Sequence, residues 1–568
     1  MRYTQKSQKK SSGSRCFCVA LAVVGAIVAV VLVCGLAYYF SAGVYSNIIA
    51  TTEPQPRRGV LRVAYSPEKA DLFTALVKEF NAQGLRTPDG DVLMVEADEM
   101  DPDRMIQQAI EGRVDAVNPD SSIWLDQIDR AWMTQQQTET GLIGDTVRYA
   151  VSPVVIAAWE NVARSMGYPQ KRLDWQDFMA KAATDPNFKW SHPSTSSASG
   201  LLATLAMFYA GAGKTRGLTI EDATAQSTLE YVSAIQKTVR QYGEGERAVI
   251  QQVIEQGRSY LDAFVVAEQL VIYFNTTSQK DKLIAIYPRE GTLWEDHPLA
   301  LLEKADLLPG QRLAFQEFRQ FLTSNTSQLQ VLKHGFRPTD LNISLSGPSS
   351  PINLLNGVDP GEPQTTLQIP GPAVVEVIRD VWWYTKRRTN VFLVADTSGS
   401  MAGEKIAAAR EAMSVFLGQI KSDQEGVGLV TFSSQVNDVI PVAPLSTNRK
   451  ALLSQIQQMS AGGDTALLDA VWEAYTRLQQ LNDRERINAI VAMTDGQENN
   501  SRIRLNDLVA RIRSSNEKGV PVVIFCVAYG QDADYDVLGA LAKASGGQVR
   551  EGDLETIRDL YKVLSTYF

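Results

Sequence analysis

The sequence predicts an α/β protein in which two domains follow an N-terminal transmembrane helix. Residues 16–40 contain no charged side chain, and beyond them apolar, strand-like runs alternate with amphipathic, helix-like segments. A proline-rich segment at 344–372 separates two such regions. Alternation of strands and helices predicts parallel sheets covered by helices, and in the C-terminal region it predicts an open, doubly wound sheet.

The uncharged segment 16–40 spans about 37 Å as a helix at about 1.5 Å per residue, enough to cross a bilayer. Residues 1–15 carry five basic and no acidic side chains. The positive-inside rule therefore places this tail in the cytoplasm and everything after residue 40 outside, with 41–58 as a spacer. We expect an uncleaved anchor in the cell membrane. A signal peptide or a lipoprotein is the alternative, but Phe40 and Val33 stand where small residues normally precede cleavage.

Composition excludes several functional classes. The chain has 568 residues and a formal net charge of -9, and no basic stripe follows the N-terminal tail, which argues against a general nucleic-acid surface. Of the four cysteines, only Cys526 lies beyond residue 40, so that region has neither a disulfide framework nor zinc-site spacing. The sequence contains no Gly-x-Ser-x-Gly and no His-Glu-x-x-His motif. We therefore expect a binding protein rather than an enzyme.

The most informative motif is Asp396-Thr397-Ser398-Gly399-Ser400, which directly follows an apolar run. Open α/β sheets carry their sites at strand ends, and this loop places a carboxylate and two hydroxyls at one. Thr465 precedes an amphipathic segment, and Asp495 ends another apolar run. Hard divalent cations prefer oxygen ligands, so the three loops predict a metal site. The alternative is a turn with helix-capping residues. Strands are predicted here at 391–395, 427–432, 436–442, 487–493 and 522–527.

Together the three loops resemble the metal-ion-dependent adhesion site of the von Willebrand factor A family. The resemblance implies an A domain at 373–568 in which hydroxyls bind Mg²⁺ or Mn²⁺ and carboxylates hold ligand waters. It also implies an open coordination position that an acidic side chain of a partner protein completes. The implied metal-binding set is Asp396, Ser398, Ser400, Thr465 and Asp495.

The preceding region, 59–343, begins in the order strand, helix, strand, helix, strand, which predicts a parallel sheet. The pattern restarts after residue 150, and we expect the apolar run 283–287 to return as a strand to the first lobe. Two lobes joined by two crossovers would form a hinged cleft. The first strands are predicted at 60–64, 92–95, 114–117 and 153–158.

This region resembles bacterial extracytoplasmic solute-binding proteins of the two-lobed type, through the segments 60–66, 114–117, 149–155 and 192–200. The resemblance implies that loops at strand ends contact a solute in the cleft. The implied contacts are Ser66, Asp120, Ser121, Ser122, Ser194, Thr195, Ser196, Ser197 and Ser199, with Glu268 expected to face the same cleft.

The serine-rich run 194–199 precedes an expected apolar helix, whose unpaired N–H groups and dipole favour an anionic solute. Asp120 opposes a purely anionic solute, because two buried negative charges repel. Alternatively, the run caps the helix and binds nothing.

These features predict a membrane-anchored, extracytoplasmic binding protein. A solute-binding module is tied by the linker 344–372 to a domain that adheres to a protein partner through a metal ion. Two alternatives stay open: an enzyme that turns over a small molecule in the cleft, and a scaffold that has lost solute binding. The sequence names neither the solute, the partner nor the oligomeric state.

Overall fold

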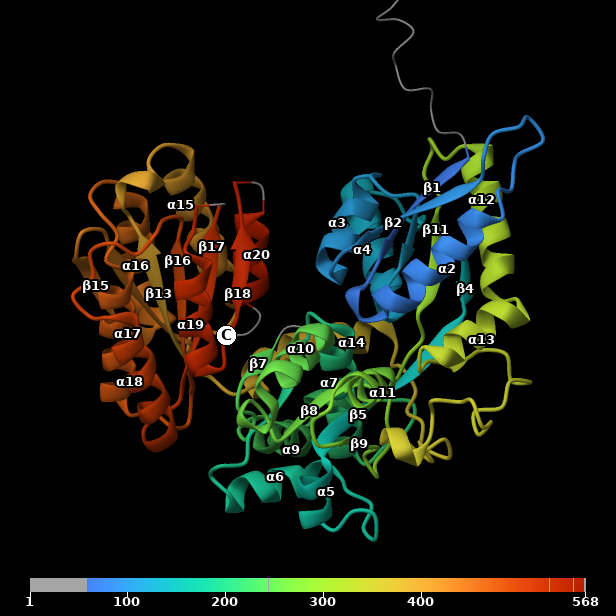
Figure 1. Ribbon diagram of the computed structural model, residues 1–568, viewed down its shortest axis with the longest axis horizontal. Helices are drawn as coiled ribbons and strands as arrows, with labels where there is room; N and C mark the ends of the chain where they lie inside the picture. The colour runs from blue at the N-terminus through green and yellow to red at the C-terminus, as the bar shows by residue number, and fades with distance from the viewer. Residues whose placement is uncertain (1–58, 244, 531, 555, 566–568) are drawn as a thin grey trace, which may run out of the picture.

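The computed structural model describes residues 59–243, 245–530, 532–554 and 556–565, so the predicted tail, transmembrane helix and spacer lie outside the described residues. Within these ranges no helix is both long and apolar enough to cross a bilayer. Figure 1 shows two lobes, drawn mainly in blue and green, and a C-terminal domain in orange and red beside them. Elements from later in the chain, including β11 and α12, complete the first lobe.

The first lobe is built on a five-stranded sheet in the order β2-β1-β3-β11-β4. The first three strands are parallel, as the predicted order requires, whereas β11 runs antiparallel to both of its neighbours. The strands are β1 (Val60–Tyr65), β2 (Met94–Glu99), β3 (Ala116–Asn118), β4 (Ile143–Arg148) and β11 (Pro298–Leu302). The helices are α2 (Ala70–Ala82), α3 (Pro102–Ile110), α4 (Ile123–Gln136), α12 (Pro309–Leu322) and α13 (Asn325–Lys333).

The second lobe has a mixed sheet in the order β10-β5-β8-β6-β7, with β9 and β12 also paired to β5. Its α7 is buried from Ala198 to Tyr209, which explains the continuous apolar run in its sequence. The strands are β5 (Ala150–Trp159), β6 (Trp190–Pro193), β7 (Tyr242–Gly243), β8 (Ala263–Ala267), β9 (Leu283–Ile286), β10 (Trp294–Glu295) and β12 (Arg337–Pro338). The helices are α5 (Glu160–Ser165), α6 (Trp175–Thr184), α7 (Ala198–Ala212), α8 (Ile220–Thr224), α9 (Gln226–Gln236), α10 (Glu246–Gln256) and α11 (Glu268–Thr277).

The expected return of the run 283–287 to the first lobe is wrong. This run forms β9, which pairs antiparallel with β5 of the second lobe, and the strand that returns is β11. Both segments are short and apolar, so their sequences alone do not show which sheet each joins. The chain also passes between the lobes three times rather than twice: after β4, between β10 and β11, and after α13.

The proline-rich segment 344–372 runs over the second lobe. Ile352 and Val358 are buried there. The side chain of Asn275 in α11 donates a hydrogen bond to the carbonyl of Asn356 (Nδ2–O 2.8 Å). These contacts hold the segment against the lobe along part of its length.

The C-terminal domain is an open six-stranded sheet in the order β15-β14-β13-β16-β17-β18, parallel except for β15. Val391 and Leu393 of β13 pack with α15, α16 and α20 on one face, and Phe392 and Val394 pack with α17, α18 and α19 on the other. A strand buried on both faces in this way explains its uninterrupted apolar sequence. The doubly wound prediction is confirmed, with β18 in addition.

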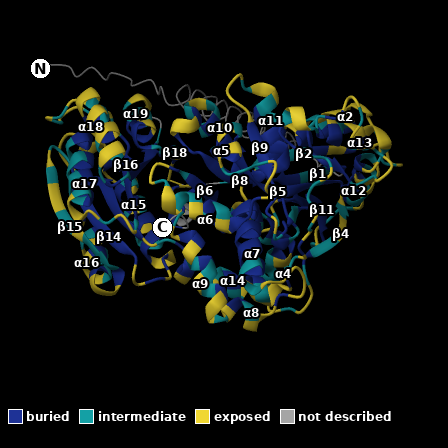
Figure 2. Ribbon diagram, turned by 90° about the horizontal axis from the view of Figure 1, so that it is seen from below, coloured by how far each residue is buried: buried dark blue, intermediate teal, exposed yellow. Residues whose placement is uncertain are grey.

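The strands of this domain are β13 (Thr389–Asp396), β14 (Gly426–Phe432), β15 (Val436–Pro444), β16 (Ile487–Thr494), β17 (Val522–Tyr529) and β18 (Val549–Gly552). The helices are α15 (Glu404–Gln419), α16 (Leu445–Gln458), α17 (Leu467–Leu481), α18 (Leu505–Lys518), α19 (Tyr535–Ser545) and α20 (Ile557–Ser565). The inner strands of the sheets are largely buried, whereas the edge strands β2, β4 and β15 are partly exposed; further exposed residues lie on loops and outer helix faces (Figure 2).

Helix α14 (Pro372–Thr385) connects the second lobe to the C-terminal domain. Its Trp382 packs edge-on against Tyr242 of the second lobe, with ring centroids 5.3 Å apart. Just after the helix, the buried Lys386 pairs with Glu425 of the C-terminal domain (Nζ–Oε1 3.1 Å). The helix that sequence boundaries assign to the C-terminal domain therefore packs into the core of the second lobe.

Candidate functional site

The five residues of the predicted metal site come together at one edge of the C-terminal sheet. β13 and β16 are adjacent and parallel, so Asp396 at the end of one strand lies beside Asp495, which follows the other. Ser400 donates a hydrogen bond to Asp495 (Oγ–Oδ1 2.6 Å) and lies 3.0 Å from Ser398 (Oγ–Oγ). A methyl group at Gly496 would lie 3.3 Å from the Ser400 hydroxyl and 3.5 Å from the Thr465 hydroxyl, so these two hydroxyls face the same point.

Asp396 is buried, and its carboxylate is held by the loop itself. It accepts hydrogen bonds from the backbone N–H of Ser398 (N–Oδ1 2.7 Å) and from the hydroxyl of Thr494. Burial raises the pKa of Asp396 and the charge of Asp495 adds to this effect, while the bonds from Thr494 and Ser398 oppose it. Two buried carboxylates this close favour a positive charge nearby.

Lys405 supplies one positive charge at this edge. It belongs to α15, and its ammonium group pairs with Oδ2 of the buried Asp495. The other oxygen of Asp495 accepts the bond from Ser400, so both of its oxygens are engaged. A cation arriving between Ser400 and Thr465 would meet the field of this lysine.

Thr465 is positioned by the loop that follows Asp495. Its N–H donates to Asn499 (N–Oδ1 2.9 Å), and its carbonyl accepts from the backbone N–H groups of Asn499 and Asn500, each at 3.1 Å. Sequence reasoning missed these asparagines, although they belong to the polar run Gln497-Glu498-Asn499-Asn500, which is separated from Asp495 only by Gly496. Asp464, next to Thr465, is exposed.

The chemistry of this donor set fits a hard divalent cation. Three hydroxyls and two carboxylates offer only oxygen atoms, and Mg²⁺ is satisfied by few protein oxygens because it retains several waters. Within the described ranges, no group of three or more His, Cys, Asp or Glu side chains is arranged to hold a metal ion. The predicted set, with two carboxylates, is not such a group.

The predicted solute contacts of the first lobe lie at the ends of its strands. Ser66 is buried and donates to Glu68 (Oγ–Oε1 2.8 Å), and Asp120 accepts from the indole of Trp124 (Nε1–Oδ1 2.6 Å). The neighbouring Ser121 is also buried. The backbone N–H of Ser122 donates a hydrogen bond to the carboxylate of Asp296, which lies in the crossover between β10 and β11.

In the second lobe, part of the serine-rich run 194–199 caps α7. Ser197 accepts a hydrogen bond from the backbone of Gly200 (N–Oγ 3.2 Å), which is the predicted capping role. The Ser194 and Ser196 hydroxyls bond each other, and Thr195 is buried beside them. Ser199 differs, because its fully buried hydroxyl bonds the carboxyl group of Glu246 at the start of α10, and this bond opposes the rise in the pKa of Glu246 that burial causes.

Glu268 is engaged inside its own lobe. Both of its oxygens accept hydrogen bonds from Arg337 (Oε1–Nε 2.9 Å and Oε2–Nη2 2.6 Å), and Tyr287 donates to the same carboxylate. All three side chains are buried. The carboxylate that the sequence directs into the cleft therefore forms a bidentate ion pair, a geometry that holds both partners in place.

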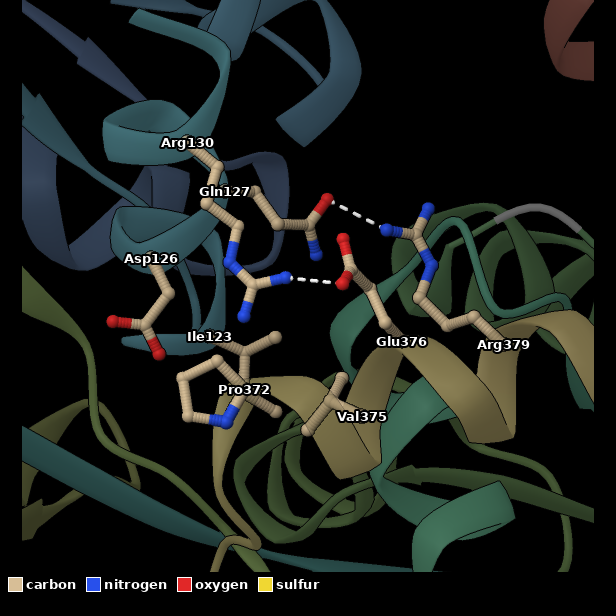
Figure 3. A pocket seen from close by; sticks show the side chains of 8 residues that line it. All are labelled: Ile123, Asp126, Gln127, Arg130, Pro372, Val375, Glu376 and Arg379. Carbon is tan, nitrogen blue, oxygen red and sulfur yellow. Dashed lines mark hydrogen bonds and ion pairs between the residues drawn. The ribbon is translucent and has the colours of Figure 1, made fainter. Parts of the chain in front are cut away.

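The two lobes are also linked through α14. Figure 3 shows Arg130 of α4 pairing with Glu376 of α14 (2.5 Å), and Arg379 donating to Gln127 (Nη1–Oε1 2.8 Å). Because α14 packs on the second lobe, these bonds link the second lobe to the first. The pocket that they border has a volume of about 30 Å³, too small for a solute. It is lined by Ile123, Asp126, Gln127, Arg130, Pro372, Val375, Glu376 and Arg379.

Comparison with known families agrees with both resemblances. The family model of the bacterial extracellular solute-binding protein matches residues 61–337, and that of the von Willebrand factor type A domain matches residues 390–562. The chain combines a solute-binding domain with an A domain. The fold predicted for each region is thereby confirmed, and the five residues of the predicted metal site lie within the match to the A domain.

Curated relatives include inter-alpha-trypsin inhibitor heavy chain H4 of Sus scrofa, 31% identical over 166 residues, which are 28% of this chain and 18% of that protein. Heavy chain H2 of Homo sapiens is 23% identical over 184 residues, 30% of this chain and 19% of that protein. The chain thus spans less than a fifth of the length of these relatives.

Similar solved structures include a von Willebrand factor type A protein from Catenulispora acidiphila, with 22% identity, TM-score 0.28, and coverage of 32% of this chain and 42% of that chain. A periplasmic thiamin binding protein has 15% identity, TM-score 0.41, and coverage of 57% of this chain and 94% of that chain.

Proposed function

We propose that the protein is a membrane-anchored, extracytoplasmic binding protein that grips an acidic group of a protein partner through Mg²⁺ or Mn²⁺ in its A domain. The supporting observation is that two strand-end carboxylates and three hydroxyls, contributed by three loops, meet at one edge of the sheet. Membrane anchoring with a cytoplasmic N-terminus rests on the uncharged segment 16–40 and the basic tail before it.

Each residue of the A-domain site has a distinct role in this proposal. Ser398, Ser400 and Thr465 would hold the ion through their hydroxyls, while Asp396 and Asp495 would hold its waters. The bound ion supplies an open coordination position for a carboxylate of the partner. The Ser398 N–H and the Thr494 hydroxyl keep Asp396 oriented toward the loop. These groups bind and orient, so we propose a binding role rather than a catalytic one.

Capture of partners from solubilised membranes tests this function with the full-length protein as bait. We expect a partner to be retained in Mg²⁺ and released by a chelator. The Asp396→Ala bait should retain nothing, whereas Asp464→Ala, which removes an exposed carboxylate beside Thr465, should behave like the wild type. Capture that is equal with and without the metal would contradict the proposal.

Replacing Lys405 by methionine should strengthen Mg²⁺ binding by about tenfold, because it removes a positive charge that contacts Asp495 and repels an incoming cation. Calorimetric titration of the full-length protein with Mg²⁺ measures the change. Lys421→Met is the matched control, since that lysine forms an exposed pair with Asp380. Unchanged or weaker binding in Lys405→Met would show that the lysine does not oppose the ion.

A second function, binding of a small solute, is favoured by a cavity between the lobes. It has a volume of about 280 Å³, near the lower end for ligand pockets. Glu68 and Leu72 of the first lobe and Arg247 and Gln269 of the second line it. A cavity with walls from both lobes supports a solute receptor over the scaffold alternative.

A further inference from the structure

Ionisable side chains from both lobes of the solute-binding domain meet in the interior. The short 3₁₀ turn after β1 (Pro67–Lys69) and the loop after β3 contribute from the first lobe, while the start of α10, the end of β10 and the crossover to β11 contribute from the other side. We name this group the interlobe acidic cluster. Its members, all buried, are Glu68, Lys69, Asp120, Glu246, Glu295 and His297.

Distances connect the cluster across the lobes. His297 lies 3.8 Å from Glu68 (Nδ1–Oε1) and 3.7 Å from Glu295 (Nε2–Oε2), which is beyond hydrogen-bond range on both sides. Lys69 lies 3.4 Å from Glu68 (Nζ–Oε1), and its ammonium also donates to two backbone carbonyls. His297 thus lies between Glu68 of the first lobe and Glu295, which belongs to a strand of the second lobe.

The cluster has more acids than bases. It contains four carboxyl groups and one ammonium group, while burial and the nearby Lys69 charge hold the pKa of His297 well below its usual range, so this imidazole is neutral. Burial is also the largest cause that raises the pKa values of Asp120, Glu246 and Glu295, and neighbouring carboxylates raise them further. Without a further cation, these acids therefore retain protons that an exposed carboxyl would lose.

The imidazole of His297 has no hydrogen bond within the described residues, although both of its ring nitrogens are buried. Glu246 and Glu295 form a hydrogen bond with each other, and the Ser199 hydroxyl bonds Glu246, so the two acids share protons rather than pair with a cation. Leaving buried polar groups unpaired is costly, and native structures rarely do so outside functional sites. His297 also has a φ of +36°, a strained conformation for a residue other than glycine.

The cavity of about 280 Å³ reaches this cluster, because Glu68 is part of both. The basic residues on the cavity wall lie elsewhere: Arg247 pairs with Asp71 across the lobes (3.6 Å), and Lys333 is exposed. Glu68 therefore connects the cavity wall to the other acids of the cluster.

We propose that the cleft binds a small organic cation, whose ammonium or guanidinium group donates hydrogen bonds to Glu295, Glu246 and Glu68. This inference rests on the proposed solute binding and specifies the class of solute. The neutral His297 ring offers a further acceptor. An anion at the start of α7, as the serine run alone suggests, would instead lie against these carboxylates.

An organic cation also fits better than a bare metal ion. No set of three or more His, Cys, Asp and Glu side chains within the described part of the chain has the spacing to hold a metal. An amine or guanidinium carries its own N–H donors, which reach acceptors that are spread around it rather than gathered at one point. Because protonated carboxyls must ionise as the cation binds, binding should release protons and strengthen as pH rises.

Calorimetry on the full-length protein tests the proposal with putrescine, agmatine and arginine as organic cations, citrate and phosphate as anions, and Ca²⁺ and Fe³⁺ as metal ions. Titrations in buffers of different ionisation enthalpy report the protons released. We expect at least one organic cation to bind with proton release. Glu295→Gln should weaken this binding by about tenfold or more, and the exposed Glu139→Gln should leave it unchanged.

Different failures have different meanings. Binding of citrate, phosphate or a metal ion that is lost in Glu295→Gln, with no organic cation bound, would overturn the cation assignment and uphold solute binding. If no probe of any class binds, both the cation assignment and the proposed solute binding fall, and the scaffold alternative stands.

The unliganded variant separates a binding role from a structural one. Glu295→Gln should melt at the same or a higher temperature than the wild type, because it removes a buried acid whose ionised form burial and the neighbouring carboxylates disfavour, while a glutamine can still bond Glu246. A large drop in melting temperature would show that the cluster is a structural ion network, which would overturn the proposal. Asp120→Asn provides a second variant, and it should also weaken cation binding if Glu295→Gln does not fold.

Discussion

Asp396→Ala should weaken Mg²⁺ binding to the A domain by about a hundredfold. The substitution removes one of two buried carboxylates that offset the cost of dehydrating the ion, and the neutral hydroxyls of Ser398, Ser400 and Thr465 provide no charge compensation. Calorimetric titration of full-length wild type and variant with Mg²⁺ measures the difference. Asp464→Ala, a matched loss of an exposed carboxylate beside Thr465, should bind like the wild type.

The fold should survive this substitution. Asp396 is the last residue of β13, and the strand is held by Val391 and Leu393 on one face and by Phe392 and Val394 on the other. Circular dichroism should therefore show unchanged secondary structure. Equal Mg²⁺ affinity in the two proteins would refute the metal site, and a loss of folding would assign Asp396 a structural role instead.

Glu268→Ala should lower the free energy of unfolding of the solute-binding domain by about 3–5 kcal/mol, because it leaves the buried Arg337 guanidinium without its bidentate partner. Denaturant unfolding measures this change. The transition of this domain has to be followed separately, since a chain with two domains does not unfold as one unit. The combined variant Glu268→Leu with Arg337→Met should recover most of the loss.

The exposed pair between Arg130 and Glu376 is the control for that measurement. Its side chains are 33% and 64% exposed, so Glu376→Ala should cost less than about 1 kcal/mol. A cost for Glu268→Ala as small as this would show that the buried pair does not stabilise the second lobe, and would restore Glu268 as a candidate for contact with the solute.

The A domain and its candidate metal site can be predicted from the local sequence pattern. The apolar runs at 391–395 and 487–493 form strands that are buried on both faces of the sheet. Their approximate lengths and ends can be read from the sequence. Parallel strands end at the same edge of a sheet, so the sequence places Asp396 and Asp495 at one edge, and the pairing of their strands brings them side by side. Local pattern sufficed for this placement because the five residues lie in short loops next to regular elements.

The strand that returns to the first lobe and the surroundings of the cleft depend on long-range packing, and local sequence does not predict them. β9 and β11 are both short and apolar, and which sheet each joins depends on packing partners that are distant in the sequence. The same holds for Glu268, whose partner Arg337 lies at the end of the domain. The interlobe acidic cluster shows this most clearly. Each of its acids is an ordinary polar residue in its own segment, and only the folding of both lobes places them together, away from water.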